Sequence, residues 1–584
     1  MSIEFHWGEA NKYALEAAKS LFIFNNGSAI ALISIFNKDI YYFLCPISLF
    51  FLGSILDLIY MACSYYANLY YGNRDCSHNQ NEKDGFDKKA KKFHKCAERF
   101  GWFALLTPII SIGFTIYIIS NLPNKDTTIS SQNIPSSIVN DITQLNPIMV
   151  ERIIAPHSIE EIAELVKTHQ GPISIGGGRY SQGGQIATEQ ALFIDMRSMN
   201  RIINLDLTKR LITVEAGTTW RKIQEAIYPH NLSLRIMQTY SNFTVGGSIS
   251  VNVHGRYIGE GALIKSLVAI TLVCADGSIK KASRDINPEL FYNAVGGYGG
   301  VGIIVDATLE LTDNVAIARS NVTMPIGDYK KFFFETIRPS TNIVFHNADI
   351  YPPNFTTINA ISWSKTEKQV TVSDRLKKIT KLNSYEQFML DWVTNGILGK
   401  EFRQYIYDPY IFHGEKIVWR NYEASYDVAG LEPASREKQT YVLQEYFVPV
   451  EHFDKFTVDM SKIFKKYSSN IINVSIRHAL PDHESTLSWS RNEVFAFVIY
   501  YAQGTTNFEK AEVAKWTSEL IDAVLKQNGT YYLPYQLIAT NDQFTKSYPN
   551  AKKYFEFKNI IDPTYKFRNK LWDKYYIKKN KGLT

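Results

Sequence analysis

The chain has 584 residues, more than one ordinary domain needs, and this length predicts two or three domains. Its composition, 45% hydrophobic and 14% aromatic, is that of a globular protein, and its formal net charge is only +6. Because the sequence has a single short basic cluster, nucleic acid is not an expected partner. The five cysteines form neither a disulfide framework nor a zinc-binding spacing, so we expect no metal site.

The first 125 residues contain three apolar runs, which predict a transmembrane helical region with spans near residues 17–36, 40–69 and 102–119. A buried helical hairpin of a soluble domain is the alternative interpretation. A basic loop, 71–101, separates the last two runs, whereas few Lys or Arg residues follow the third run up to residue 150. The positive-inside bias predicts that this loop is cytoplasmic and that the rest of the chain lies on the opposite side of the membrane.

Residues 126–146 are rich in Ser, Asn and Thr, and they predict a flexible linker. Patterns typical of strands and helices then follow one another from residue 147 to residue 314. The elements expected in this region are a strand at 152–155, a helix at 158–169, strands at 172–175, 193–195, 202–205 and 211–215, a helix at 219–227, a strand at 268–273, a helix at 290–295 and a strand at 303–311.

Residues 315–530 contain aromatic-rich strand patterns, which are typical of a second domain built on an antiparallel sheet. The last residues, 531–584, are expected to return to the first domain. The elements expected in these two regions are strands at 438–448, 471–476 and 494–501 and helices at 453–466, 507–527 and 543–557.

The stretch Asn242–Arg256 combines features that a purely structural strand does not need. Gly246 and Gly247 lack a Cβ, so the backbone there can approach a flat or anionic ligand. Small polar residues then alternate with Ile and Val, and this period of two predicts a strand with one polar face. His254 and the terminal arginine add a titratable ring and a fixed cation. A Gly-rich turn between strands, with no ligand, is the alternative.

Two further Gly-rich loops occur at 176–184 and 296–302. The second contains a formal GxGxxG pattern, but a predicted helix precedes it and a predicted strand follows it. A nicotinamide dinucleotide fingerprint requires the reverse order, and the first loop has Ser181 where the third Gly should be, so we exclude that cofactor for both loops. Backbone N–H groups of such loops form anion-binding concavities, and three of them could converge on one extended ligand with a pyrophosphate bridge.

With these loops, the chain resembles the FAD-binding oxidoreductases of the vanillyl-alcohol oxidase and p-cresol methylhydroxylase (PCMH) type, including decaprenylphosphoryl-ribose oxidase and the sugar-lactone oxidases. The motifs that carry the resemblance are Gly176–Arg179, Thr244–Arg256 and Val295–Ile304. The resemblance implies an α+β fold after the transmembrane region. Its parts are a two-subdomain FAD-binding domain at 147–314, an antiparallel-sheet substrate (cap) domain at 315–530 and a C-terminal segment at 531–584 that returns to the FAD domain.

The resemblance also implies that FAD is the cofactor. Many relatives attach the flavin covalently to a His of the first loop, but Arg179 stands near that position and the loop has no His, so we expect non-covalent FAD. The residues implied to hold FAD are Gly176, Gly177, Gly178, Arg179, Tyr180, Ser181, Thr244, Gly246, Gly247, Ser250, Gly302 and Ile304.

Five residues are candidates for catalysis. Arg477 aligns with a Lys or Arg that relatives place near the flavin, and Tyr535 falls where relatives carry a catalytic Lys. The phenol could accept a proton if Arg477 or Arg256 lowered its pKa. The alternatives are that the site lacks the usual base, or that His254 is the base; His254 could equally serve only to orient its loop. Glu445 is the fifth candidate, as a pocket residue. Further candidates for pocket lining are Tyr446, His478 and Tyr500.

The function implied is that of a membrane-anchored FAD-dependent oxidoreductase. It would oxidise a hydroxyl of a sugar, a sugar lactone (as a D-arabinono-1,4-lactone oxidase does) or a lipid-linked sugar by hydride transfer to flavin N5, with oxygen or a quinone as electron acceptor. The alternatives are a sterol-reductase-like C=C reductase and a non-catalytic flavin-fold membrane sensor. Two glycosylation sequons, at Asn242 and Asn473, lie inside the predicted cofactor and substrate loops. Because glycosylation there would block the site, we expect a bacterial inner membrane with the flavin domain on the non-cytoplasmic side.

Overall fold

The structure of the chain is a computed structural model that forms two compact units, one of residues 1–131 with 382–389 and one of residues 132–381 with 390–584. The predicted spans at 17–36, 40–69 and 102–119 lie outside the residues that it describes. Within the described part of the chain, no helix combines the length and the apolar character needed to cross a membrane. The described residues are 79–95, 137–379, 394, 396–428, 432–433 and 435–576.

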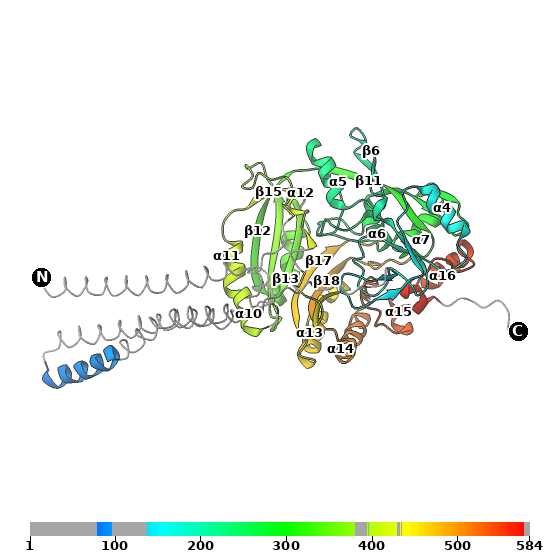
Figure 1. The fold of residues 1–584 in the computed structure, drawn as a ribbon. Coiled ribbons are helices and arrows are strands. Elements are labelled where there is room, and N and C mark those ends of the chain that lie inside the picture. Colours follow the sequence, from blue (N-terminus) through cyan, green and yellow to red (C-terminus); the bar gives the residue numbers. More distant parts are fainter. Residues whose placement is uncertain are drawn as a thin grey trace, which may run out of the picture. The chain divides into compact units, whose positions relative to one another are not determined.

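In the first unit, residues 80–95 form a helix, coloured blue in Figure 1. These residues belong to the basic segment between the second and third apolar runs. Asp87 and Lys91 form an ion pair with a distance of 2.6 Å one helical turn apart, a pairing that supports an exposed helix.

The second unit contains a small parallel sheet in the order β3-β5-β4. Helix α4 (Ile159–Thr168) connects β3 to β4, and it starts where the sequence predicts, because the Ser158 side chain accepts a hydrogen bond from the N–H of Glu161. Ile162 and Val166 on its inner face are fully buried. The strands are β3 (Arg152–Ile154), β4 (Ile173–Gly176) and β5 (Leu192–Asp195).

A second, antiparallel sheet has the order β10-β9-β11-β7-β6, with β8 also paired to β11. Its strands are β6 (Ile202–Asp206), β7 (Leu211–Glu215), β8 (Leu232–Leu234), β9 (Leu267–Val273), β10 (Ile279–Ser283) and β11 (Ile303–Asp313). The helices of this region are α5 (Trp220–Ile227), α6 (Val245–Ser250) and α7 (Pro288–Ala294), with the short 3-10 turns η2 (Met196–Ser198), η3 (Tyr228–His230) and η4 (Leu263–Ser266).

The third sheet, an antiparallel sheet of eight strands, confirms the architecture expected of the cap region (Figure 1). Its order is β15-β12-β14-β13-β17-β18-β16-β19. Trp516 of α14 contacts Tyr501 of β18 and Phe464 of α13, with ring centroids 5.0 and 5.7 Å away. This one side chain therefore packs α14 against both the sheet and α13. The strands are β12 (Ala316–Pro325), β13 (Ile343–Ile350), β14 (Thr357–Lys365), β15 (Ile417–Trp419), β16 (Gln439–Pro449), β17 (Ile471–Ala479), β18 (Val494–Gly504) and β19 (Thr530–Tyr531).

The helices of the cap region connect these strands or flank the sheet. They are α8 (Ile326–Phe332), η5 (Phe333–Ile337), α10 (Ile397–Phe402), η6 (Arg403–Tyr407), α11 (Asp408–Phe412), α12 (Arg420–Glu423), η8 (Val450–His452), α13 (Phe453–Lys466) and α14 (Asn507–Lys526).

The last part of the described chain packs on the first sheet and on the third Gly-rich loop. The hydroxyl of Ser174 donates to the carbonyl of Arg568 at 2.7 Å, and the Asn569 side chain donates to the carbonyl of Tyr298 at 2.9 Å. The helix predicted at 543–557 is instead two helices, because Pro549 interrupts it. They are α15 (Asn541–Ser547) and α16 (Ala551–Ile561), and α17 (Lys570–Tyr575) follows.

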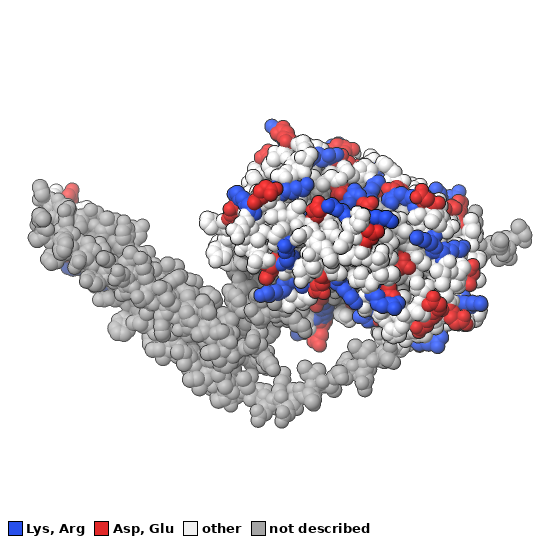
Figure 2. Space-filling model, turned by 90° about the horizontal axis from the view of Figure 1, so that it is seen from above, with Lys and Arg blue, Asp and Glu red and all other residues white. Residues whose placement is uncertain are grey.

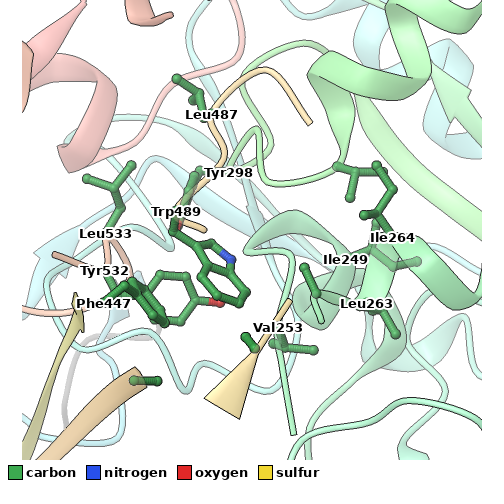
Figure 3. Packing of buried hydrophobic residues seen from close by; sticks show 14 of the residues in the cluster. Ile249, Val253, Leu263, Ile264, Tyr298, Phe447, Leu487, Trp489, Tyr532 and Leu533 are labelled. Carbon is green, nitrogen blue, oxygen red and sulfur yellow. The ribbon is translucent and has the colours of Figure 1, made fainter. Parts of the chain in front are cut away.

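Two further expectations need correction. The linker predicted over 126–146 extends too far, because β1 (Ile138–Val139) pairs with β2 (Ile148–Met149) and Asp141 between them is buried. The strand predicted after Thr244 is the short helix α6. Apolar residues at every second position also recur at every fourth position, and Val245 and Ile249, four residues apart, are fully buried on one face of the helix. Figure 3 shows Ile249 packed in the core.

The surface of the described residues mixes charges of both signs. On the face shown in Figure 2, Lys and Arg side chains are interspersed with Asp and Glu side chains. Several of them form ion pairs, such as Arg235 with Glu260 and Glu310 at 2.9 and 2.6 Å.

Candidate active site

The three Gly-rich loops, which are far apart in the sequence, line one cleft in the second unit. The cleft encloses about 1730 Å³ of empty space, including the part that is open to solvent. Gly176 lies in β4 and does not line it. The other residues implied to hold FAD all do: Gly177, Gly178, Arg179, Tyr180, Ser181, Thr244, Gly246, Gly247, Ser250, Gly302 and Ile304.

Two glycines of these loops have different physical reasons to be glycine. A Cβ on Gly176 would lie 2.2 Å from the ring of Phe193, so this residue allows β4 and β5 to pack closely. Gly247 is exposed in the cleft, and a Cβ there would meet only the Thr244 hydroxyl, at 3.0 Å. The space beside Gly247 therefore remains available to a ligand.

Arg179 is held in the wall of the cleft in a left-handed conformation, with φ of 62°. Its guanidinium donates to Asp195 at 3.0 Å and lies over the ring of Phe193, 5.0 Å from its centroid. Among the described residues, its Nε atom has no hydrogen-bond partner although it is buried. Arg179 thus presents a cation and an unsatisfied donor at the first Gly-rich loop.

His254, in the loop after α6, and Glu445, on β16, meet at the cleft although they are 191 residues apart. The Nε2 atom of His254 lies 2.5 Å from Oε1 of Glu445, and its Nδ1 atom lies 3.2 Å from the carbonyl oxygen of Gly255. Both side chains are 4% exposed, and both residues line the cleft. The hydroxyl of Tyr535 donates to the second carboxylate oxygen, Oε2, at 3.3 Å. The three side chains therefore form a continuous chain of polar contacts.

An aromatic cluster fixes the ring of His254. The rings of Phe447 and Trp489 stack with centroids 4.1 Å apart, and Tyr532 packs edge-on against Phe447 at 5.3 Å (Figure 3). The His254 ring contacts all three, at 5.0 Å from Trp489 and 5.6 Å from Phe447. This packing restricts the imidazole to the orientation that faces Glu445.

The condition under which Tyr535 could act as a base, a pKa lowered by Arg477 or Arg256, is not met. Burial and the carboxylate of Glu445 raise the pKa of Tyr535 well above 10, and the opposing effect of Arg477 is smaller. The phenol is therefore neutral at physiological pH. It cannot be a base by itself, but it can accept one proton while it donates another.

The two arginines predicted to act in catalysis lie in different surroundings. Arg477, on β17, lines the cleft, and among the described residues its buried Nε atom has no hydrogen-bond partner. Arg256 is not among the residues that line the cleft. Its guanidinium forms a buried ion pair with Glu423 of α12 at 3.0 Å and also donates to the Glu423 carbonyl. A structural role therefore accounts for Arg256, because Glu423 neutralises it.

Of the three further candidates for pocket lining, only Tyr500 lines the cleft. Tyr446 is buried and donates to Gln444, and His478 is paired with Glu493 at 2.6 Å. Sequence reasoning missed several cleft residues, most of which lie in or beside the Gly-rich loops and reach the cleft only through the tertiary fold. They are Gln182, Gln185, Gln238, Thr239, Tyr240, Phe243, Tyr298, Arg436, Tyr441 and Tyr532.

The residues of the cleft fit FAD in shape and in chemistry. Gly247 leaves a flat surface free, and the Nε atoms of Arg179 and Arg477 and the hydroxyl of Thr239 are buried without a hydrogen-bond partner among the described residues. Buried polar groups are seldom left unsatisfied, so these atoms indicate a polar ligand. Aromatic side chains on the same walls suit the rings of that ligand.

Comparison with known proteins supports the same cofactor. Residues 150–283 match the family model described as an FAD binding domain. Bovine L-gulonolactone oxidase is 23% identical over 437 residues, which are 73% of this chain and 95% of the relative. Decaprenylphosphoryl-beta-D-ribose oxidase of Mycolicibacterium smegmatis is 24% identical over 422 residues, 68% of this chain and 86% of the relative. Mouse L-gulonolactone oxidase is 32% identical over 163 residues, 27% of this chain and 37% of the relative.

These similarities confirm the resemblance that the three loops indicate and FAD as the cofactor. The chain is an FAD-dependent oxidoreductase related to sugar-lactone and ribose oxidases. The roles of individual cleft residues, the substrate and the attachment to a membrane remain predictions.

Proposed function

We propose that this chain is a membrane-anchored FAD-dependent oxidoreductase that oxidises a hydroxyl of a sugar, a sugar lactone or a lipid-linked sugar. The observation that carries the proposal is that the Gly-rich loops, Arg477 and the polar chain His254–Glu445–Tyr535 all line the same cleft. The similarity to lactone and ribose oxidases supports the substrate class.

Oxidation of an alcohol to a carbonyl requires that the carbon loses a hydride and that the oxygen loses a proton. Bound in the cleft, FAD supplies the two-electron acceptor for the hydride. The protein must therefore position the substrate, exclude water and accept the hydroxyl proton.

Glu445 is the proton acceptor in this proposal, and Tyr535 connects it to the substrate. The neutral phenol of Tyr535 already donates to Oε2 of Glu445. As the substrate hydroxyl gives its proton to the phenol oxygen, the phenol proton passes to the carboxylate, and the substrate O–H bond is exchanged for a new O–H bond on Glu445. His254, 2.5 Å from the other carboxylate oxygen, orients Glu445 and stabilises its charge before the transfer.

Arg477 provides the positive charge that the same step needs. Its guanidinium lines the cleft with an unsatisfied Nε donor, and negative charge develops on the cofactor and on the substrate oxygen during the reaction. A fixed cation in a buried site stabilises such charge without reorganisation of solvent.

Absorption spectra of the purified chain test the cofactor and its attachment. We expect a flavin spectrum, and after acid precipitation we expect the flavin in the supernatant, because Arg179 cannot form the covalent link. Flavin that stays in the pellet would show a covalent bond and would overturn that part of the proposal.

Anaerobic mixing with candidate substrates tests the reaction. Sugars and sugar lactones such as D-arabinono-1,4-lactone should bleach the oxidised flavin. A C=C reductase would instead show reoxidation of the reduced flavin by an alkene. A non-catalytic membrane sensor would be favoured by folded protein without any flavin spectrum. Oxygen and a soluble quinone, offered separately to the reduced enzyme, would identify the electron acceptor.

The membrane part of the proposal depends on the three apolar runs of the first 125 residues. If they span a bacterial inner membrane, the full chain should stay in the membrane pellet after an alkaline carbonate wash. Protease added to the outside of spheroplasts should then digest the flavin domain. Digestion only after lysis would place the flavin domain on the cytoplasmic side and would contradict the predicted orientation.

A further inference from the structure

A short stretch at the edge of the cap region exposes five large apolar or aromatic side chains within seven residues. They are Tyr405, Ile406, Tyr407, Tyr410 and Ile411, with exposed fractions of 66%, 58%, 45%, 81% and 40%. They lie on η6 and α11, and we call residues 403–412 the exposed segment. Such a concentration on a protein surface marks contact with another apolar surface.

The charges of the exposed segment point inward. Asp408, its only carboxylate, is buried, accepts a hydrogen bond from the hydroxyl of Tyr351 at 2.8 Å and faces Arg403 at 3.5 Å. From the other side, Arg319 donates to the carbonyl of Ile411 at 3.0 Å. An apolar medium could therefore cover the outer face of the segment without the desolvation of a carboxylate.

The exposed segment rests on the strands that form the cap side of the cleft. Arg403 donates to the carbonyl of Ile472 at 3.1 Å and to the side chain of Asn473 at 3.3 Å. Asn473 is paired with Tyr500 across β17 and β18, and Tyr500 lines the cleft beside Tyr441, with ring centroids 5.5 Å apart. One strand pair, β17 and β18, thus separates the segment from Tyr441 and Tyr500, which we call the aromatic end of the cleft.

We propose that the exposed segment inserts into the interfacial layer of a lipid bilayer and so places the aromatic end of the cleft at the membrane surface. The inference rests on the proposed membrane attachment. Only residues 120–136 separate the third apolar run from the described fold, and fully extended they span at most roughly 60 Å. The fold therefore stays within reach of the bilayer. Tyrosine and isoleucine on a short helix suit the interface between lipid and water.

This placement favours one substrate class. A sugar carried on a lipid would reach the cleft from the bilayer, with its headgroup at the flavin and its apolar part along Tyr441 and Tyr500. A free sugar would gain nothing from such a position. The inference therefore deepens the proposed function toward a lipid-linked sugar.

Photo-cross-linking in the full-length protein tests the contact. Benzoylphenylalanine replaces Tyr410 in one variant and Phe508, 74% exposed on α14, in a matched control. Both proteins are reconstituted into vesicles of phosphatidylcholine and phosphatidylglycerol, irradiated and analysed by peptide mass spectrometry. We expect at least about a tenfold higher yield of phospholipid adducts at position 410 than at position 508.

Three results would overturn the inference: equal lipid yields at the two positions, adducts between position 410 and residues 1–136 of the same chain, or adducts between two copies. Carbonate-resistant pelleting of the same sample reports the membrane attachment separately. The flavin spectrum and its bleaching report the oxidoreductase function, so each failure is distinguishable from the others. A Tyr410→Ser/Ile411→Ser variant should keep its FAD and its bleaching by a soluble lactone in detergent. In vesicles, its adduct yield from benzoylphenylalanine at position 406 should fall to the level of the control.

Discussion

The Nε2 atom of His254 lies 2.5 Å from Oε1 of Glu445, across 191 positions of the sequence. Each ring nitrogen faces an oxygen atom, the second being the Gly255 carbonyl at 3.2 Å. The second oxygen of Glu445 accepts from the hydroxyl of Tyr535. This arrangement places the carboxylate one hydrogen bond beyond the phenol, where the proposed mechanism needs a proton acceptor.

Replacement of Glu445 by Gln should slow flavin reduction by the substrate roughly 10²–10⁴-fold, the usual contribution of a general base. FAD should remain bound, because Glu445 is not in the Gly-rich loops. Anaerobic stopped-flow measurement of flavin bleaching gives the rate, and the absorption spectrum gives the FAD content.

The matched control is Glu493→Gln. Glu493 also faces a histidine, with its Oε1 atom 2.6 Å from Nε2 of His478, but neither residue lines the cleft. This variant should reduce its flavin at nearly the wild-type rate. If both variants slow flavin reduction equally, the effect of Glu445→Gln reflects stability and not proton transfer.

Tyr535→Phe should slow flavin reduction by about 10- to 100-fold, less than Glu445→Gln, since a water molecule can take the place of the hydroxyl. Because burial and Glu445 raise the pKa of Tyr535 well above 10, the wild-type rate should show no ionisation of this phenol between pH 6 and pH 10. A wild-type step in that range that disappears in Tyr535→Phe would contradict the proposed role.

Gly247→Trp should lose most of its bound FAD, because the indole would occupy the open space beside Gly247. The control is Gly327→Trp, a position at the start of α8 where a Cβ meets nothing within 4 Å. The ratio of flavin absorbance to protein absorbance after gel filtration measures occupancy. Normal occupancy in the Gly247 variant would remove this loop from the cofactor site.

The Arg477→Ala variant should keep its FAD. Its flavin should be reduced by the substrate at least roughly 10²-fold more slowly than in wild type, as expected for a lost cation near developing negative charge. Arg477→Lys should recover part of the rate, since it restores the charge without the planar fork. An alanine variant with the wild-type rate of flavin reduction would exclude Arg477 from the site.

Acid should destabilise the fold partly through Glu493. Hydrogen bonding to His478, then to Arg338, lowers the pKa of Glu493 from 4.5 to about 2, against the effect of burial. Because the pKa of Glu493 is lower in the folded state than the unfolded value of 4.5, its ionised carboxylate stabilises the fold at pH values above 4.5. This contribution is lost as the pH falls toward 2. The melting temperature of Glu493→Gln should therefore lie about 2–4 °C below that of wild type at pH 6 and approach it at pH 3. A difference in melting temperature between the two proteins that becomes larger in acid would contradict the stabilising contact between Glu493 and His478.

Local sequence signals determined most of the elements in the first folded region. Ser158 predicts the start of α4 and caps it, and the alternation at Leu211–Glu215 predicts β7 with its observed bounds. These signals succeed because caps and side-chain periodicity act within a few residues. They fail for α6, because six residues cannot separate a period of two from a helical period.

The sequence by itself also identified the cofactor, through the resemblance of its three Gly-rich loops to those of FAD-binding oxidoreductases, and the match of residues 150–283 to an FAD binding domain confirms it. Only the tertiary structure decided which charged groups share the cleft. Arg256 stands two residues from His254, yet Glu423 draws it into a buried ion pair, while Glu445 reaches His254 from β16 of the cap sheet. The pKa of Tyr535 rises for the same reason. Burial and the charges of distant residues decide these properties, and neither is encoded in the residues next to them along the chain.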